Sequence, residues 1–363
     1  MKTSVTGGKS GSLPESWLKV SAAGLWCEPG GFHIDPHRPV DKAVLTHGHS
    51  DHARAGHRRV LATAPTLAIL KSRYGDAAAG QVQALAYGEE VRIGEVGVRL
   101  VPAGHVLGSA QAVLEYRGQR IVVSGDFKRR ADPTCPPFEP VACDVFVTEA
   151  TFGLPVFRHP HDAEEIGRLL HSLALFPERT HLIGAYTLGK AQRVIALLRR
   201  AGFERPIYIH GAMEKLCRLY QDFGVDLGEL RPATGAQGNR SGGELPGEIV
   251  LAPPSAIAER WSRRFAEPVT AVASGWMRVR ARARQAHAEL PLVISDHADW
   301  DELLQTMVDV AAPEVWVTHG NEEALMYAAT RQGRRARALA LIGRGEEDET
   351  AAVPAQSGEA TLL

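Results

Sequence analysis

The chain has 363 residues, and its 41 lysines and arginines nearly balance its 42 aspartates and glutamates. The net charge of the whole chain therefore predicts no class of partner, and any affinity for nucleic acid must come from a local patch of basic residues. The apolar fraction of 44% is ordinary for a globular protein, and no apolar run approaches the length of a membrane-spanning helix. Residues 1–17 lack the apolar segment of a signal peptide and favour a flexible lead-in.

The cysteines and the end of the chain give two further expectations. The four cysteines form no Cys-x-x-Cys pair, so we expect reduced, mostly structural thiols in a cytoplasmic protein. Residues 344–363 are acidic and then small and polar, which predicts a disordered tail.

The first 150 residues alternate short apolar runs with turn residues, a pattern typical of β-strands. Strands are expected at residues 96–103, 112–116, 121–125 and 144–150. The short link 117–119 between two of these runs predicts a β-hairpin.

From about residue 156 the pattern changes to alternating strands and helices, which predicts α/β units on a mostly parallel sheet. Helices are expected at residues 162–175, 188–201, 213–223, 255–265 and 299–310. Strands are expected at residues 181–186, 207–210, 248–252, 269–274, 292–295 and 315–318. Residues 231–247 are rich in glycine and predict a long loop.

Residues 46–53, THGHSDHA, place three histidines and an aspartate within six positions at the end of an apolar run. Imidazole nitrogen and carboxylate oxygen both bind zinc and similar divalent ions. In an extended segment residues i and i+2 point the same way, so His47 and His49 can reach one ion together. Asp51 and His52 follow where the chain turns, and they can serve a second ion. A solvated polar loop is the alternative interpretation.

Further metal-binding side chains follow other apolar runs. His105 follows residues 100–104, Asp126 follows 121–125, His297 follows 292–295 and His319 follows 315–318. A side chain just past a strand can emerge from the edge of a sheet into a shared cleft. One such histidine alone is more often structural, but the repeated pattern favours a single cluster.

Taken together, these motifs resemble those of the metallo-β-lactamase fold, in which THGHSDHA is the metal-binding loop. Five further segments are similar to motifs of its nuclease branch, the β-CASP proteins: PAGHVLGSA (102–110), SGDF (124–127), TEATFG (148–153), SDHAD (295–299) and THGNEE (318–323). Within that branch, residues 35–54 and SGWMRVR (274–280) resemble most closely the bacterial ligase-associated DNA exonucleases.

The resemblance implies an α/β fold in which a metallo-β-lactamase αββα sandwich carries an inserted α/β β-CASP domain. Its expected divisions are 1–155 for the first part of the sandwich, 156–288 for the insert, 289–343 for the closing part and 344–363 for the tail.

The same resemblance implies two divalent metal ions. One would be held by His47, His49, His105 and Asp126, and the other by Asp51, His52, Asp126 and His319, with Asp126 bridging. Zinc suits this histidine-rich set, although manganese accepts the same ligands. Asp35 matches the family's supporting aspartate and would orient a ligand histidine. An aspartate that starts a turn before Pro36 is the alternative interpretation of Asp35.

Two metal ions together can ready water for attack and clamp a phosphate, so Asp126 and Asp51 are expected to take part in catalysis. The resemblance also implies a role for His297, which would contact the scissile phosphate or protonate the departing oxygen. Glu149 would pair with His297 and favour its charged form. A carboxylate at the end of a strand, facing solvent, is the alternative for Glu149. Asp299 can cap the helix that follows it.

Substrate contacts are expected in two places. In an extended chain Arg278, Arg280, Arg282 and Arg284 share one face and could bind successive phosphates. Trp261 and Trp276 lie nearby in the sequence, and a tryptophan could stack on a base. In a helix the same arginines would spread around the axis and be merely solvated. Lys190 begins a predicted helix, where a phosphate could bind. The alternative there is Thr187 as a plain N-cap.

The preferred function is a two-metal DNA exonuclease in end processing or repair. The alternatives are an RNA-processing nuclease of the same branch, a small-molecule metallo-hydrolase and a catalytically silent scaffold. The expected partners are nucleic acid, preferably DNA, and by resemblance a DNA ligase and a helicase, without a membrane.

Overall fold

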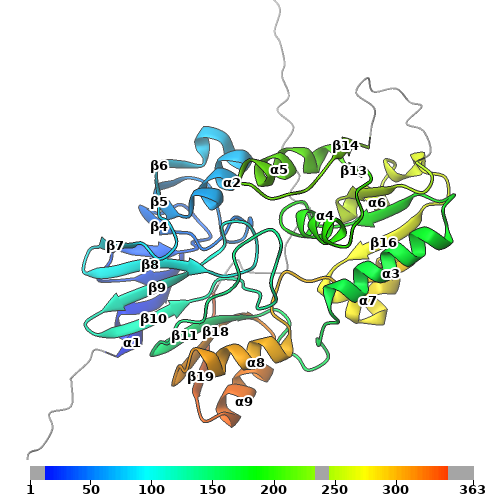
Figure 1. The fold of residues 1–363 in the computed structure, drawn as a ribbon. Coiled ribbons are helices and arrows are strands. Elements are labelled where there is room, and N and C mark those ends of the chain that lie inside the picture. The colour runs from blue at the N-terminus through cyan, green and yellow to red at the C-terminus, as the bar shows by residue number, and fades with distance from the viewer. Residues whose placement is uncertain (1–12, 234–244, 342–363) are drawn as a thin grey trace, which may run out of the picture.

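The computed structural model describes residues 13–233 and 245–341, which form three β-sheets with helices packed on their faces (Figure 1). Of the expected N-terminal lead-in, residues 1–12 lie outside the described ranges, whereas Pro14–Trp17 form a short helix with Trp17 buried, so a flexible segment is wrong there. The expected tail and most of the expected loop at 231–247 also lie outside the described ranges. None of the helices in the described part has the length and apolar character needed to cross a bilayer.

The first sheet has six strands that lie in chain order. The first three are antiparallel, and the remaining pairs are parallel. Its strands are β1 (Leu18–Ser21), β2 (Gly24–Cys27), β3 (Phe32–Ile34), β4 (Lys42–Val44), β5 (His57–Ala62) and β6 (Ala79–Ala84). The short helix α1 (Pro14–Trp17) precedes it, and α2 (Ala64–Tyr74) connects its last two strands.

The second sheet has seven strands in the order β19-β18-β11-β10-β9-β8-β7. They are β7 (Glu90–Ile93), β8 (Val96–Pro102), β9 (Ala110–Tyr116), β10 (Gln119–Val123), β11 (Val145–Ala150), β18 (Glu314–Gly320) and β19 (Arg335–Ala338). The hairpin expected at 117–119 is confirmed, because Tyr116 of β9 pairs with Gln119 of β10. Strands β18 and β19 come from the end of the chain and close this sheet beside β11.

These two sheets pack face to face with helices outside them. Apolar side chains of both sheets, such as Phe32, Leu100 and Trp316, form one buried cluster between them. On the outer face of the first sheet, Leu70 of α2 packs on strands β4 and β5. Helices α8 (Trp300–Asp309) and α9 (Glu322–Arg331) cover the outer face of the second sheet, where Leu303 of α8 belongs to a buried apolar cluster. The expected αββα sandwich is confirmed.

The third sheet is parallel throughout and has the order β14-β13-β15-β12-β16-β17. Its strands are β12 (His181–Gly184), β13 (Ile207–Ile209), β14 (Leu230–Pro232), β15 (Ile249–Ala252), β16 (Val269–Ala273) and β17 (Leu290–Leu292). Helices α3 (Asp162–Leu175), α4 (Lys190–Arg200) and α5 (Gly211–Asp222) pack on one face, whereas α6 (Pro254–Ala258) and α7 (Arg280–Gln285) pack on the other.

Alternating side chains explain why both faces of this sheet are covered. Within β15, Ile249 and Leu251 join the cluster with α3 to α5, while Val250 and Ala252 join the cluster with α6. The helix expected at 255–265 is wrong beyond Ala258, where α6 ends because the backbone of Glu259 is extended. The chain then turns again at Ser262–Arg264. The strand expected at 292–295 ends at Leu292 and pairs with β16.

Candidate metal centre and catalytic pocket

The histidine loop follows β4 and ends before β5, at the edge of the first sheet that faces the third (Figure 1). His47, His49 and His52 are all buried, and Asp51 is half-buried. The loop lies close to the strand that precedes Asp126. A Cβ atom added to Gly125 would come within 2.6 Å of the Thr46 hydroxyl, and Gly125 has a φ of +57°. Glycine therefore allows the two segments to meet.

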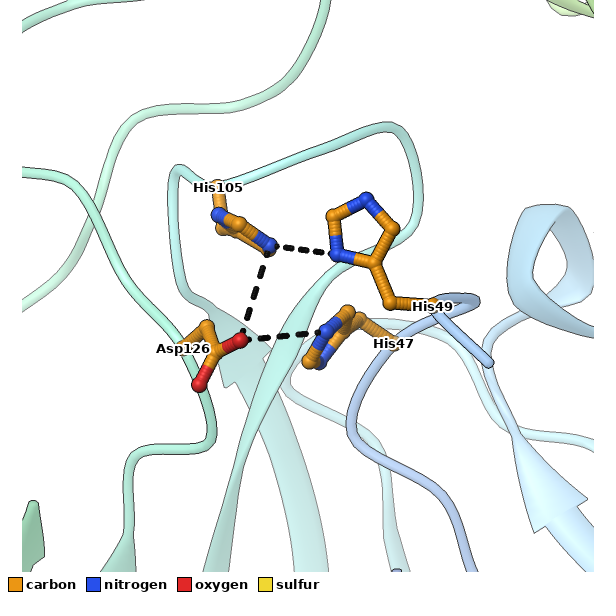
Figure 2. A group of neighbouring side chains, drawn as sticks. All are labelled: His47, His49, His105 and Asp126. Atoms are coloured by element: carbon orange, nitrogen blue, oxygen red, sulfur yellow. Dashed lines mark hydrogen bonds and ion pairs between the residues drawn. The ribbon is translucent and has the colours of Figure 1, made fainter. Parts of the chain in front are cut away.

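Four of the expected ligands converge around Asp126. The ligand atoms of His47, His49, His105 and Asp126 all lie within 4.8 Å of one another (Figure 2). Nε2 of His47 is 3.5 Å from Oδ2 of Asp126, and Nε2 of His105 is 3.9 Å from the same oxygen. Nε2 of His105 also lies 2.9 Å from Nδ1 of His49. All four side chains are buried, so this is an interior cluster.

The other expected ligands also gather around Asp126, but only His319 faces its second oxygen. Nε2 of His52 is 3.4 Å from Oδ2 of Asp126 and 3.4 Å from Oδ2 of Asp51. Nε2 of His319, at the end of β18, is 3.4 Å from the other Asp126 oxygen, Oδ1. Asp126 thus contacts members of both expected sets, as a shared ligand would.

Several hydrogen bonds fix the rings of this cluster. Asp35 accepts from the Thr46 amide at 2.7 Å and from its hydroxyl at 2.6 Å, and its Oδ2 lies 2.8 Å from Nδ1 of His52. Asp35 has a φ of +44°, a strained value for this residue type that such contacts help to maintain. The expected part of Asp35 in orienting a histidine therefore has direct geometric support.

The two Thr-His-Gly segments of the chain share one arrangement. The hydroxyl of Thr46 lies 3.1 Å from Nδ1 of His47, and the hydroxyl of Thr318 lies 2.8 Å from Nδ1 of His319. In each case the Nδ1 contact leaves Nε2 to face Asp126. Sequence reasoning missed the threonines, although the repeated Thr-His-Gly triplet was a visible signal.

Burial sets the charge of the cluster. It lowers the pKa of His47 well below the usual value, with His52 adding to the effect, and it lowers the pKa of His105 to about 3. Burial alone would raise the pKa of the Asp126 carboxyl, but the imidazoles of His52, His319 and His47 hold it well below its usual range. His47 and His105 are therefore neutral beside an ionised Asp126, the protonation states that metal ligands need.

The residues fit a divalent metal ion on a second observation. Nε2 of His47 and Oδ1 of Asp51 are buried and make no hydrogen bond to any described residue. A buried polar atom without a partner costs stability, and a metal ion that accepts its lone pair would remove that cost. Nitrogen and oxygen donors of this kind suit zinc and manganese.

Next to the cluster, His297 and Glu149 form a buried pair. Nδ1 of His297 lies 2.9 Å from Oε2 and 3.0 Å from Oε1 of Glu149, and the Phe127 amide donates to Oε1 at 2.8 Å. Burial acts to lower the pKa of His297, but the Glu149 carboxylate outweighs it and raises that pKa to about 10. Glu149 is 1% exposed, so its alternative interpretation as a solvent-facing carboxylate is wrong.

A cavity of about 390 Å³ joins these groups to the third sheet and its helices. Its lining includes Asp51, Asp126, His297, His319, Lys190 and Arg282. The Lys190 ammonium forms a buried ion pair with Asp296, whose backbone oxygen lies 2.9 Å from Nδ1 of His105. Asp296 thus links Lys190 to the histidine cluster, a role that sequence reasoning did not assign.

The structure corrects the expected row of arginines. Residues Gly275–Arg278 form a 3-10 turn, and Arg280–Gln285 form α7, so the expected extended face is wrong. Only Arg282 of these arginines lines the cavity, while Arg278, Arg280 and Arg284 are exposed. Alanines at alternate positions favour the helix.

The N-cap of α4 is Gly189 and not Thr187, so the interpretation of Thr187 as a plain N-cap is also wrong. Asp299 caps α8, where it accepts from the Glu302 amide at 3.0 Å.

Comparison with known proteins gives the family. The model described as "Beta-lactamase superfamily domain" matches residues 17–210. A solved structure, of a protein of unknown function from Enterococcus faecalis V583, superimposes with a TM-score of 0.55 at 14% identity, over 82% of this chain and 78% of that one. At that identity the likeness supports the fold alone.

Curated relatives carry names from nucleic-acid metabolism. A protein named "Probable DNA ligase" from Opitutus terrae is 29% identical over 342 residues, 92% of this chain but only 32% of that protein. Ribonuclease TTHA0252 from Thermus thermophilus is 26% identical over 390 residues, 87% of this chain and 89% of that protein. Cleavage and polyadenylation specificity factor subunit 3 of Dictyostelium discoideum is 29% identical over 218 residues, 49% of this chain and 28% of that protein. These names agree with the expected resemblance to the nuclease branch. Because the superfamily model covers more than half of its length, this chain belongs to the beta-lactamase superfamily.

Proposed function

We propose that this chain is a metal-dependent nuclease that hydrolyses DNA from a strand end. The observation that carries the proposal is the shared cavity, in which Asp126 and its histidine neighbours lie beside the His297–Glu149 pair and the cationic Lys190 and Arg282. A phosphodiester needs a metal-activated nucleophile, a proton donor and cations for the phosphate, and this cavity gathers groups suited to all three.

In this proposal His47, His49, His105 and Asp126 hold one ion, while Asp51, His52, Asp126 and His319 hold the other. When bound, the two ions activate water and neutralise charge on the phosphate. His297 keeps its proton because Glu149 faces Nδ1, and it delivers a proton from Nε2 to the departing oxygen. Lys190 and Arg282 contact phosphates of the strand.

DNA is the preferred substrate because the relative named a DNA ligase matches 92% of this chain. The chain spans about a third of that protein, so a joint task with a ligase in end processing or repair belongs to the proposal. Association with a helicase, zinc as the metal, a cytoplasmic location and the domain divisions at 155/156 and 288/289 are proposed from sequence and resemblance.

RNA processing is the second candidate, supported by the ribonuclease relative, which matches this chain over 89% of its own length. A small-molecule hydrolase is disfavoured by the cations of the insert that line the cavity.

The test uses DNA labelled at its 5′ or 3′ end and matched RNA, with zinc and manganese compared. We expect stepwise shortening of DNA from one end in the presence of metal, and slower loss of RNA. Cleavage of RNA alone would replace the proposal with its second candidate. Hydrolysis of nitrophenyl esters without cleavage of either nucleic acid would overturn both.

A further inference from the structure

The wall of the cavity contains a tryptophan that the proposed chemistry does not use. Trp276 lies in the 3-10 turn Gly275–Arg278 and is half-buried. It lines the same cavity as His297 and Asp126. The indole therefore borders the space that holds the proposed catalytic groups.

Two phenylalanines, which also line the cavity, pack against the ring of Trp276. Its centroid lies 4.8 Å from that of Phe152 and 5.1 Å from that of Phe157, and both phenylalanines are buried. A Cβ atom added to Gly275 would come within 2.4 Å of the Phe152 ring, so glycine permits this close packing. The indole is therefore held in place before any ligand arrives, which reduces the entropy lost on binding.

A planar cation covers Trp276. The guanidinium carbon of Arg282, in α7, lies 3.9 Å from the centroid of the indole. Both residues line the cavity, so the stack of guanidinium on indole borders the space that holds the reacting groups. The Phe152 ring packs against Trp276 and lies 6.1 Å from the ring of His297, which places the stack near the proposed site of cleavage.

We propose that the Trp276–Arg282 stack is a nucleobase subsite, which holds the base nearest the scissile phosphate. This inference rests on the proposed nuclease function. Bases stack on aromatic rings and on guanidinium planes, and every base offers the same kind of face, so the subsite binds a nucleotide with little regard to sequence. Loss of one such contact weakens binding roughly five- to hundred-fold.

The test compares strands that carry a normal base or an abasic residue at successive positions from the end. With the unaltered chain, KM should rise roughly five- to hundred-fold when one position lacks its base, while kcat changes little. Trp276→Ala should raise KM for normal strands and abolish this discrimination, and Trp276→Phe should retain most of it. Equal KM values for base-containing and abasic strands in the unaltered chain would overturn the inference without any variant.

Trp261 provides the matched control, because its ring also has an arginine, Arg264, at 5.2 Å but does not line the cavity. Trp261→Ala should therefore keep the discrimination against abasic strands. If Trp276→Ala discriminates as strongly as the unaltered chain, the subsite is refuted although the chain is a nuclease. If the unaltered chain degrades no nucleic acid, the proposed function itself fails.

Discussion

The imidazole of His297 and the carboxylate of Glu149 form a closed pair, with Nδ1 at 2.9 and 3.0 Å from the two carboxylate oxygens. Glu149 sits within β11 of the sandwich, whereas His297 follows the last strand of the third sheet. The pair therefore depends on the docking of the third sheet against the sandwich. Its protonated imidazole lies beside the metal-binding cluster, as its ring centroid is 4.7 Å from that of His105.

We expect His297→Ala to lower kcat on labelled DNA by about 10²- to 10⁴-fold, because the proton donor is lost. Metal content, measured by mass spectrometry after dialysis, should stay unchanged. Glu149→Gln removes the charge that raises the pKa of His297, so the alkaline limb of its kcat profile should move to lower pH. Loss of metal in His297→Ala would instead make His297 a ligand.

Asp126 has the central place in the cluster, since its two oxygens face different histidines. We expect Asp126→Ala to abolish hydrolysis and to lower the number of bound ions per chain. The measurement is metal content at saturating zinc, with Asp41→Ala as a control at a surface carboxylate that pairs only with arginines among the described contacts. A variant that keeps both ions and its activity would remove Asp126 from the bridging position.

Lys190 and Asp296 allow a test that separates substrate binding from stability. Lys190→Met should raise KM and reduce the slope of log KM against log salt by roughly 0.7–0.9, the loss of one phosphate contact. It should also destabilise the fold by about 3–5 kcal/mol, because the buried Asp296 loses its lysine partner and keeps, among the described residues, only the more distant His297, at 3.9 Å.

The double variant Lys190→Met with Asp296→Asn removes both charges of this pair. Urea unfolding should show that its stability is largely restored, whereas KM should stay high. Recovery of KM together with stability would mean that Lys190 only supports the fold.

Much of the fold could be predicted where its signals are local. Helix α3 begins and ends at the expected residues, since acidic side chains fill its first turn and apolar positions follow its period. The long strands β8 and β9 have several apolar positions each, which makes them recognisable as strands in the sequence. Strands β1 to β4 have only three or four residues, too few to show a period, and they were missed.

The cluster was predictable in part for a geometric reason. His105 and Asp126 follow strands β8 and β10, and His319 ends β18, so the sheet itself brings distant segments to one edge. The Arg-x-Arg pattern at 278–284 carries no such information, because it fits an extended segment or a helix equally well. The stack of Arg282 on Trp276 and the pairing of Lys190 with Asp296 depend on tertiary contacts that no local pattern encodes.

His159 gives a prediction for stability in acid. It is 9% exposed, and neither ring nitrogen makes a hydrogen bond to a described residue. Burial lowers its pKa to about 3, and the nearby Lys128, Arg130 and Lys190 act in the same direction. The unfolded chain, with a histidine pKa of about 6.5, binds more protons between these two values. The free energy of unfolding must therefore fall as the pH falls from about 6.5 toward 3.

Between pH 8 and pH 5, the free energy of unfolding should fall by about 2 kcal/mol less in His159→Phe than in the parent chain. The reason is that phenylalanine cannot take up a proton when the chain unfolds. Urea unfolding at several pH values measures this difference. The other buried histidines keep their own contributions in both proteins, so the comparison isolates His159. Exposed His171 supplies the control, and His171→Gln should leave the pH dependence unchanged. An identical pH dependence in His159→Phe and the parent would show that folding does not lower the pKa of His159, for instance because a hydrogen bond that forms in solution stabilises its protonated form.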